Sequence, residues 1–170
     1  TWGVWSNGGI DLNNDSQDFI LSGKQQVHYI LGIPSNIPTA LTSQRVIYSF
    51  VGGTTPSLET ANTNATLNGQ LANSSYLDFD FGANTVGLNL DINLTGTTNS
   101  LLNATGKTTL VVNNNIGSYN FDNLSIKLAN GNSCNSLGCT GTASGFLAGQ
   151  EGQLAALNYT ISGVNSIVND

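Results

Sequence analysis

The chain has 170 residues, of which only 8% are charged, and its 4 basic and 10 acidic side chains give a net charge of -6. Four scattered cations cannot form the basic patch that nucleic-acid phosphates require, and they equally disfavour an anionic membrane surface. No apolar run approaches the ~20 residues of a membrane-spanning helix. We expect a single domain over residues 1–170, which could be the C-terminal domain of a larger protein.

The first half of the chain predicts short strands separated by long loops. Pro34 and Pro38 exclude a helix between them and indicate an extended connection. Val46, Tyr48 and Phe50 occupy alternate positions before two glycines, as expected of a half-buried strand. The strands expected in this half lie within residues 1–10, around 19–21, and at 27–31, 45–51 and 67–71.

The clearest pattern of the chain is LDFDFGANTVGLNLDINLT, at residues 77–95. Apolar residues occupy every second position on both sides of a short Ala-Asn-Thr turn, which places them on one face of two successive strands. Two such arms joined by a turn of about four residues predict a β-hairpin. The second arm is long, so its apolar face requires a large partner surface.

The second half is expected to continue as strands, with a connection over 96–106 and at most a brief helical turn at 150–154. These strands are expected at 107–112, 124–128, 142–148 and 157–161. The spacing predicts an all-β fold, and we expect an antiparallel up-and-down β-barrel of about eight strands. Closure would remove the exposed edges that a charge-poor sheet otherwise leaves unprotected. The side chains expected inside the barrel are Phe79, Phe81, Leu88, Leu90, Ile92, Phe146, Tyr159 and Ile161.

Cys134 and Cys139 enclose four residues of a loop rich in glycine, asparagine and serine. A zinc site needs four ligands, whereas the chain has one histidine besides these two cysteines. A redox pair would usually have CxxC spacing. We therefore predict a structural disulfide, which indicates an oxidising location: the periplasm, the cell surface or the secreted state.

His28 is the only histidine and lies in the strand-like segment VHYIL. A hydrolase triad would need a nucleophile context such as GxSxG, which the sequence lacks. A single histidine can hold haem iron, so one alternative is a haem carrier that uses His28 or a tyrosine such as Tyr29 or Tyr48. The simpler interpretation is that His28 is a strand residue whose ring forms hydrogen bonds with neighbouring groups.

Asp78 and Asp80 are predicted on one face of a strand, about 7 Å apart, with Asp91 on the same face of the partner strand. Paired carboxylates at this distance could serve a glycan hydrolase, which needs a cleft and one raised pKa. Calcium is a further alternative, although it would need more oxygen ligands from loops. Because these aspartates lie opposite the apolar stripe, we expect them on a solvated sheet face.

Two segments near the C-terminus follow a recognisable pattern. Residues 145–149, GFLAG, are a small-residue strand that ends in an aromatic and a glycine, and residues 156–161, ALNYTI, alternate toward a tyrosine and an isoleucine. These segments, with 27–34 and 48–56 upstream, resemble the transferrin-binding protein B-like β-barrel of Gram-negative bacterial surface and periplasmic proteins. The small cysteine loop before the final hairpin also fits this resemblance.

The resemblance implies an eight-stranded antiparallel barrel filled by side chains, with a non-enzymatic role. We expect no cofactor. Members of the family bind host iron carriers, haem or regulatory ligands through variable loops. The expectation is therefore an extracytoplasmic interaction module of a Gram-negative bacterium that presents loops to a protein partner. It could serve iron acquisition. No binding residue is carried over, because the loops do not match.

Overall fold

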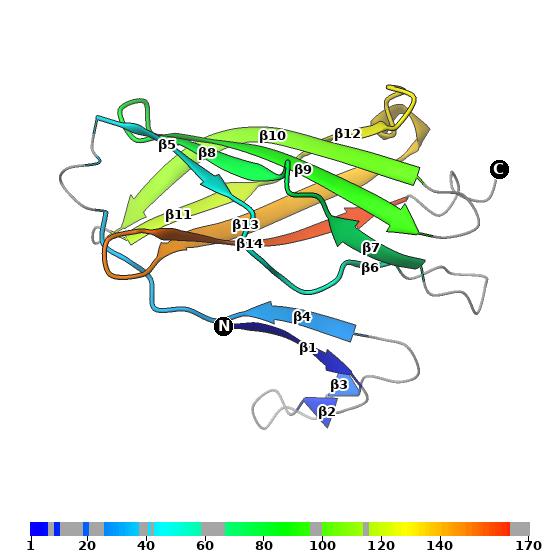
Figure 1. Cartoon of the computed structure of the whole chain (residues 1–170), viewed down its shortest axis with the longest axis horizontal. Coiled ribbons are helices and arrows are strands. Elements are labelled where there is room, and N and C mark those ends of the chain that lie inside the picture. Colours follow the sequence, from blue (N-terminus) through cyan, green and yellow to red (C-terminus); the bar gives the residue numbers. More distant parts are fainter. Residues whose placement is uncertain are drawn as a thin grey trace.

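The computed structural model describes residues 1–6, 9–10, 19–20, 26–37, 41, 43–58, 67–95, 100–113 and 116–163. The regular structure of this part of the chain is almost entirely β, with a ten-stranded antiparallel sheet that curls into a half-barrel (Figure 1). A 3₁₀ turn, η2 (Asn135–Leu137), lies between the strands near the C-terminal end of the sheet. Among the residues described, no helix has the length and apolar character needed to cross a membrane.

Four short N-terminal strands precede the large sheet and form two small sheets of their own. These strands are β1 (Trp2–Ser6), β2 (Gly9–Ile10), β3 (Phe19–Ile20) and β4 (Gln26–Ile30). The large sheet contains β5 (Arg45–Ser49), β6 (Ser57–Leu58), β7 (Leu67–Leu71), β8 (Tyr76–Asp80), β9 (Thr85–Thr95), β10 (Ser100–Asn113), β11 (Ile116–Phe121), β12 (Ser125–Leu128), β13 (Thr140–Ala148) and β14 (Leu154–Ser162).

The two longest strands, β9 and β10, form the centre of the sheet. They pair without interruption from Ser100 opposite Leu94 to Thr109 opposite Thr85. On its other edge, β9 pairs with β8 along its first half and with β7 along its second half. The far edge of β10 is likewise divided between β12 and β11, and the sheet continues from β11 through β13 to β14. The predicted central hairpin is confirmed as β8 and β9.

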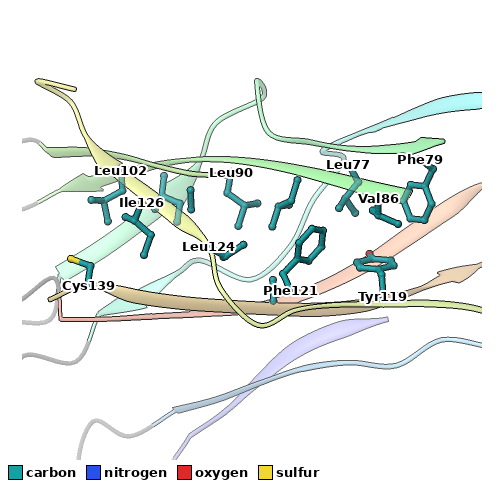
Figure 2. Close-up of a cluster of buried hydrophobic side chains, with 14 of the residues drawn as sticks. Leu77, Phe79, Val86, Leu90, Leu102, Tyr119, Phe121, Leu124, Ile126 and Cys139 are labelled. Atoms are coloured by element: carbon teal, nitrogen blue, oxygen red, sulfur yellow. The ribbon is translucent and has the colours of Figure 1, made fainter. Parts of the chain in front are cut away.

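The curl of the sheet is visible in a contact between two aromatic rings. Phe79 of β8 and Tyr119 of β11 meet edge to face, with ring centroids 5.3 Å apart. These strands are separated in the sheet by β9 and β10, so their rings can touch only if the sheet bends around its apolar face. Figure 2 shows side chains of β8 and β9 pointing toward those of β11 across this interior.

Apolar side chains at alternate positions along the strands fill the interior. The predicted inward residues of the central hairpin are all buried, as are alternate residues of β10, β11 and β12. Rows of close-packed apolar side chains of this kind supply most of the stability of a sheet. The fully or nearly fully buried apolar side chains of β8, β9 and β10 are Leu77, Phe79, Val86, Leu88, Leu90, Ile92, Leu94, Leu102, Ala104 and Leu110; those of the later segments include Tyr119, Phe121, Leu124, Ile126 and Leu147.

Phe146 is the one expected interior residue that the structure places elsewhere. Leu147 is fully buried in the core, and Phe146, its neighbour on β13, lies on the opposite face of the strand. A Cβ at Gly32 would lie 3.1 Å from the Phe146 ring, so the ring packs outside the sheet against the segment after β4. The prediction failed because glycine and alanine fill the inward positions before Leu147, which hides the apolar face of β13. Tyr159 and Ile161 do pack against the core, partly buried.

The connection predicted over 96–106 is also wrong from residue 100 onward, since β10 begins at Ser100, and residues 96–99 lie outside the described residues. Leu102 and Ala104 face the core, and a Cβ at Gly106 would come within 3.0 Å of Leu124 and Phe121. Only a small residue fits at the inward position of Gly106, so the sequence does not show there the alternation of large apolar and polar residues by which a strand is predicted. The possible helical turn at 150–154 is instead a tight turn that runs into β14.

The N-terminal ribbon, formed by antiparallel β1 and β4, packs beside the open side of the half-barrel (Figure 1). A Cβ at Gly52 would lie 3.0 Å from Cζ2 of Trp2. After the ribbon, Ser35 donates its backbone N–H to the carbonyl of Leu147 at 2.8 Å. The chain thereby crosses from the ribbon over the ends of β13 and β11 before it enters β5.

The terminal strands of the sheet approach each other without pairing. In the described residues, β5 pairs only with β8 and β14 only with β13. A side-chain bond links the two ends: the Tyr48 hydroxyl of β5 donates to the carbonyl of Gly152, in the turn before β14, at 2.6 Å. The all-β antiparallel prediction is confirmed, and the architecture that the structure shows is a half-barrel.

Candidate functional site

Large apolar side chains are exposed where the N-terminal ribbon meets the sheet. Ile33 is 87% exposed, Val51 80%, Leu31 63% and Trp2 49%. Trp2 stands opposite Ile30, so its side chain lies on the face of the ribbon that packs against Gly52, and Leu31 lies on the other face. In a chain with so few charges, exposed apolar side chains in this region are candidates for a binding surface. We call these four residues, Trp2, Leu31, Ile33 and Val51, the ribbon surface.

The backbone that carries the ribbon surface is held in place. Leu31 donates its backbone N–H to the carbonyl of Thr1 at 2.8 Å, and the N-terminal ammonium of Thr1 donates to the carbonyl of Leu31 at 2.8 Å. Pro34, directly after Ile33, bridges to Ala148 at the end of β13. Exposed apolar side chains on a fixed backbone lose little conformational entropy on binding, which favours recognition.

His28 lies on the inner side of the ribbon, where it contacts the segment between β5 and β6. Its Nδ1 is 2.6 Å from Oγ1 of Thr54, a hydrogen bond whose direction depends on the tautomer. Partial burial lowers the pKa of His28 through desolvation, which favours the neutral imidazole. The structure therefore places this residue in the contact that docks the ribbon.

The two tyrosines considered beside His28 have separate partners. Tyr29 lies over Gly3, its direct neighbour on β1, and a Cβ at Gly3 would overlap its hydroxyl. Tyr48 spans the ends of the sheet through its bond to Gly152, and its ring stands edge to face against Phe79 at 5.0 Å. Burial raises the pKa of Tyr48. The three side chains do not converge on a common site.

Asp78 and Asp80 lie on the outer face of the sheet, as predicted. Arg45 donates from both Nε and Nη2 to the two oxygens of Asp78, and this pair lowers the pKa of Asp78. Asp80 instead accepts the backbone N–H of Ala83 at 2.9 Å and so shapes the turn before β9. Each carboxylate thus has a structural partner of its own.

Asp91 shares their face but lies far along the sheet. Asp78 stands opposite Gly87, which is four residues before Asp91 and therefore about 13 Å away along β9. In the part of the chain that the structure describes, no three acidic, histidine or cysteine side chains come close enough to hold a metal ion. The three aspartates do not assemble one site.

A hydrogen-bond network surrounds Asp91 on the outer face, and sequence reasoning did not find it. One carboxylate oxygen accepts from the Ser74 hydroxyl at 2.6 Å and from Asn89 Nδ2 at 3.2 Å, and the other accepts from Asn103 Nδ2 at 2.6 Å. These bonds, that of Ser74 first, lower the pKa of Asp91. The only sequence signal is polar residues at alternate positions, which does not reveal which of them become neighbours.

Cys134 and Cys139 form the predicted disulfide, with Cα atoms 5.3 Å apart and both residues buried at one end of the core. Asn135 organises the loop between them. Its Oδ1 accepts the backbone N–H of Ile126 at 2.5 Å, while its Nδ2 donates to the carbonyls of Leu124 at 2.9 Å and Cys139 at 3.2 Å. The disulfide and the side-chain amide of Asn135 together hold the loop across the end of the half-barrel.

Comparison with protein-family models, with curated proteins and with solved structures finds no match for this chain.

Proposed function

We propose that the protein is a non-enzymatic interaction module that binds a macromolecular partner through the ribbon surface. The observation that carries this proposal is the exposure of Leu31 and Ile33 on fixed backbone, with Trp2 and Val51 also exposed where the ribbon meets the sheet. Burying a side chain such as Ile33 or Leu31 contributes about 1.5–3 kcal/mol each. Two or three such contacts suffice as the centre of a specific interface.

The location proposed for this module is outside the cytoplasm of a Gram-negative bacterium, at the surface, secreted or in the periplasm. The buried disulfide supports it, because such bonds persist in oxidising compartments. The resemblance to the transferrin-binding protein B-like barrel supports the same location and suggests iron acquisition as a context. An eight-stranded closed barrel is part of this proposal, and the Tyr48–Gly152 bond between the two ends of the sheet supports it.

A carrier that holds its ligand inside the barrel fits less well. Large aromatic and aliphatic side chains such as Phe79, Phe121 and Leu147 occupy the interior and are at most 2% exposed. A core packed in this way has no volume for a macrocycle such as haem. Binding at the surface is the mode that such a scaffold supports.

A glycan hydrolase that uses Asp78 and Asp80 also fits less well. The general acid of such an enzyme needs a raised pKa, whereas the pairing with Arg45 lowers the pKa of Asp78. Asp80 is engaged by the turn at Ala83. The hydrogen bonds of both residues favour a structural role.

Site-specific photocrosslinking tests the proposal. A photoreactive phenylalanine analogue is placed at position 33, and at position 47 as the control, because Ile47 is exposed on β5 outside the ribbon surface. With periplasmic and surface fractions of a Gram-negative bacterium, position 33 should give a discrete macromolecular adduct and position 47 should not. Excess parent protein should compete the adduct away, whereas the double variant Leu31→Ser/Ile33→Ser should not. Equal labelling at both positions, or competition by the double variant, would contradict the proposal.

A further inference from the structure

A mixed aromatic and polar row crosses the outer face of the sheet, separate from the ribbon surface. Tyr76 of β8 stands directly opposite Asn89 of β9, and Asp91 follows two residues along the same strand. Asp91 stands opposite Asn103 of β10, which in turn stands opposite Lys127 of β12. We call these five residues the outer row. Because the row crosses three strand spacings, it extends about 14 Å.

The polar centre of the row is held in one arrangement. Asn103 Nδ2 donates to Asp91 Oδ1 at 2.6 Å and to Asn89 Oδ1 at 2.9 Å, and Asn89 Nδ2 donates to Asp91 Oδ2 and to the carbonyl of Ser74, both at 3.2 Å. Each amide has two N–H bonds to donate, so these contacts use them all. The groups of the two asparagines and the aspartate that remain available to a ligand are oxygen atoms, which accept hydrogen bonds. A ligand for this centre must therefore supply hydrogen-bond donors.

The residues at the two ends of the row indicate what else a ligand must carry. Tyr76 is 41% exposed, which leaves part of its ring free to stack. Lys127 is exposed at the other end and can donate to a ligand oxygen. The charges of Lys127 and Asp91 cancel, so the row as a whole suits a neutral ligand and favours neither a polycation nor a polyanion. A neutral molecule with hydroxyls that both donate and accept, and with apolar ring faces, is a sugar.

We infer that the outer row binds a neutral oligosaccharide. One sugar ring stacks on Tyr76, hydroxyls donate to the oxygens of Asp91 and Asn103, and Lys127 donates to a hydroxyl farther along. The length of the row requires an oligosaccharide, since one sugar ring cannot reach both ends. Binding involves no bond cleavage, and it uses a surface distinct from the one proposed for the macromolecular partner.

NMR titration of the whole chain with maltohexaose, cellohexaose and N-acetylchitohexaose tests this inference. At least one of these hexasaccharides should shift the side-chain amide signals of Asn89 and Asn103 and the backbone amide of Tyr76. Tyr76→Ala should weaken that binding about tenfold, whereas Tyr76→Phe should retain it because the ring is kept. Val111→Ala, which shortens an exposed side chain elsewhere on β10, is the matched control and should leave binding unchanged.

Three outcomes would overturn the inference. The first is that none of the three hexasaccharides shifts the Asn89 and Asn103 signals. The second is that Tyr76→Ala binds like the parent while its melting temperature shows that it is folded. The third is that a lysine-rich peptide shifts the row and the sugars do not, which would indicate a basic protein segment as the ligand. None of these results depends on the crosslinking at position 33.

Discussion

The hydroxyl of Tyr119 donates a hydrogen bond to the backbone carbonyl of Ala156 at 2.5 Å, although a whole strand lies between them. Tyr119 is on β11, Ala156 is on β14, and the strand between them is β13. The contact is possible because Gly145 on β13 stands opposite Tyr119, and any Cβ there would overlap both the tyrosine hydroxyl and the Ala156 carbonyl. Burial raises the pKa of Tyr119, so the hydroxyl stays protonated and donates. The glycine thus lets a side chain tie three strands together.

Gly145→Ala is expected to destabilise the fold more than an ordinary strand substitution. The added methyl must displace Tyr119 or the backbone at Ala156, and overpacking of this kind costs about 1–3 kcal/mol. Chemical denaturation monitored by tyrosine fluorescence measures the loss. Thr142→Ala, at an exposed position of the same strand, is the control and should change stability by less than about 0.5 kcal/mol. Similar midpoints for the two variants would contradict the account of Gly145.

Tyr119→Phe tests the hydrogen bond without changing the packing. It leaves the buried carbonyl of Ala156 without its donor, which should cost about 1–3 kcal/mol of unfolding free energy. Tyr76→Phe removes the hydroxyl of an exposed tyrosine and should be close to neutral. A Tyr119→Phe variant as stable as the parent would show that another group or water satisfies Ala156.

Leu90→Asp should unfold the protein, because Leu90 is 2% exposed at the centre of β9 and an unpaired charge there has no partner. Leu101→Asp is the matched control: its side chain projects to the outer face of β10 and is exposed, so the charge remains hydrated. Circular dichroism and thermal melting distinguish the two. If Leu90→Asp melts like the parent, the assignment of inner and outer faces along the central hairpin is wrong.

The central hairpin was predictable because large apolar residues at alternate positions, such as Phe79 and Leu90, fix the buried face of a strand regardless of its neighbours. That signal disappears where close packing demands small side chains. Gly106 on β10 and Gly145 on β13 sit under aromatic rings, so both strands look irregular in sequence and the sidedness of Phe146 was misassigned. β11 was missed for a related reason, since only Tyr119 and Phe121 mark its buried face.

The candidate surfaces were less predictable than the core. Asp78 and Asp80 could be assigned to the outer face from alternation alone, but their partners depend on which residue of another strand stands opposite. The network of Asp91 joins β9 to β10 and to a turn, and cross-strand register fixes it. The ribbon surface depends on how β1 and β4 dock against residues 51–54, which no local pattern encodes. Partner choice in a sheet is a tertiary property.

The disulfide should leave no free thiol. Titration of the unfolded, unreduced protein with a thiol reagent is expected to find none, since Cys134 and Cys139 are bonded and are the only cysteines of the chain. Cys134→Ser/Cys139→Ser should lower the unfolding free energy by about 2 kcal/mol, the value for a small closed loop. Two reactive thiols in the parent would remove the support for an extracytoplasmic location.

Asp91 should make stability depend on pH in the acid range. Its hydrogen bonds lower its pKa in the folded state below the ordinary 3.8, so the folded state binds its proton less readily than the unfolded state. Its contribution is therefore fully present above the unfolded pKa and is lost as pH falls through the folded pKa. Urea denaturation from about pH 5 down to pH 2 should show this loss, and Asp91→Asn should flatten it. An unchanged profile in Asp91→Asn would assign the acid sensitivity to other carboxylates, such as Asp78.

Haemin titration separates the interaction module from a haem carrier. The filled interior leaves no room for the macrocycle, His28 is held against Thr54, and Tyr48 donates its hydroxyl to Gly152. A haem pocket needs apolar walls as well as an axial ligand, and the interior walls here already pack against one another. We therefore expect haemin to give no sharp Soret band with the parent protein, and His28→Ala to leave any weak absorbance unchanged. His28→Ala should still lower stability modestly, because it removes a contact that docks the ribbon, and thermal melting measures that effect independently. A stoichiometric Soret band in the parent that His28→Ala abolishes, with the variant still folded, would replace the interaction module with a haem carrier.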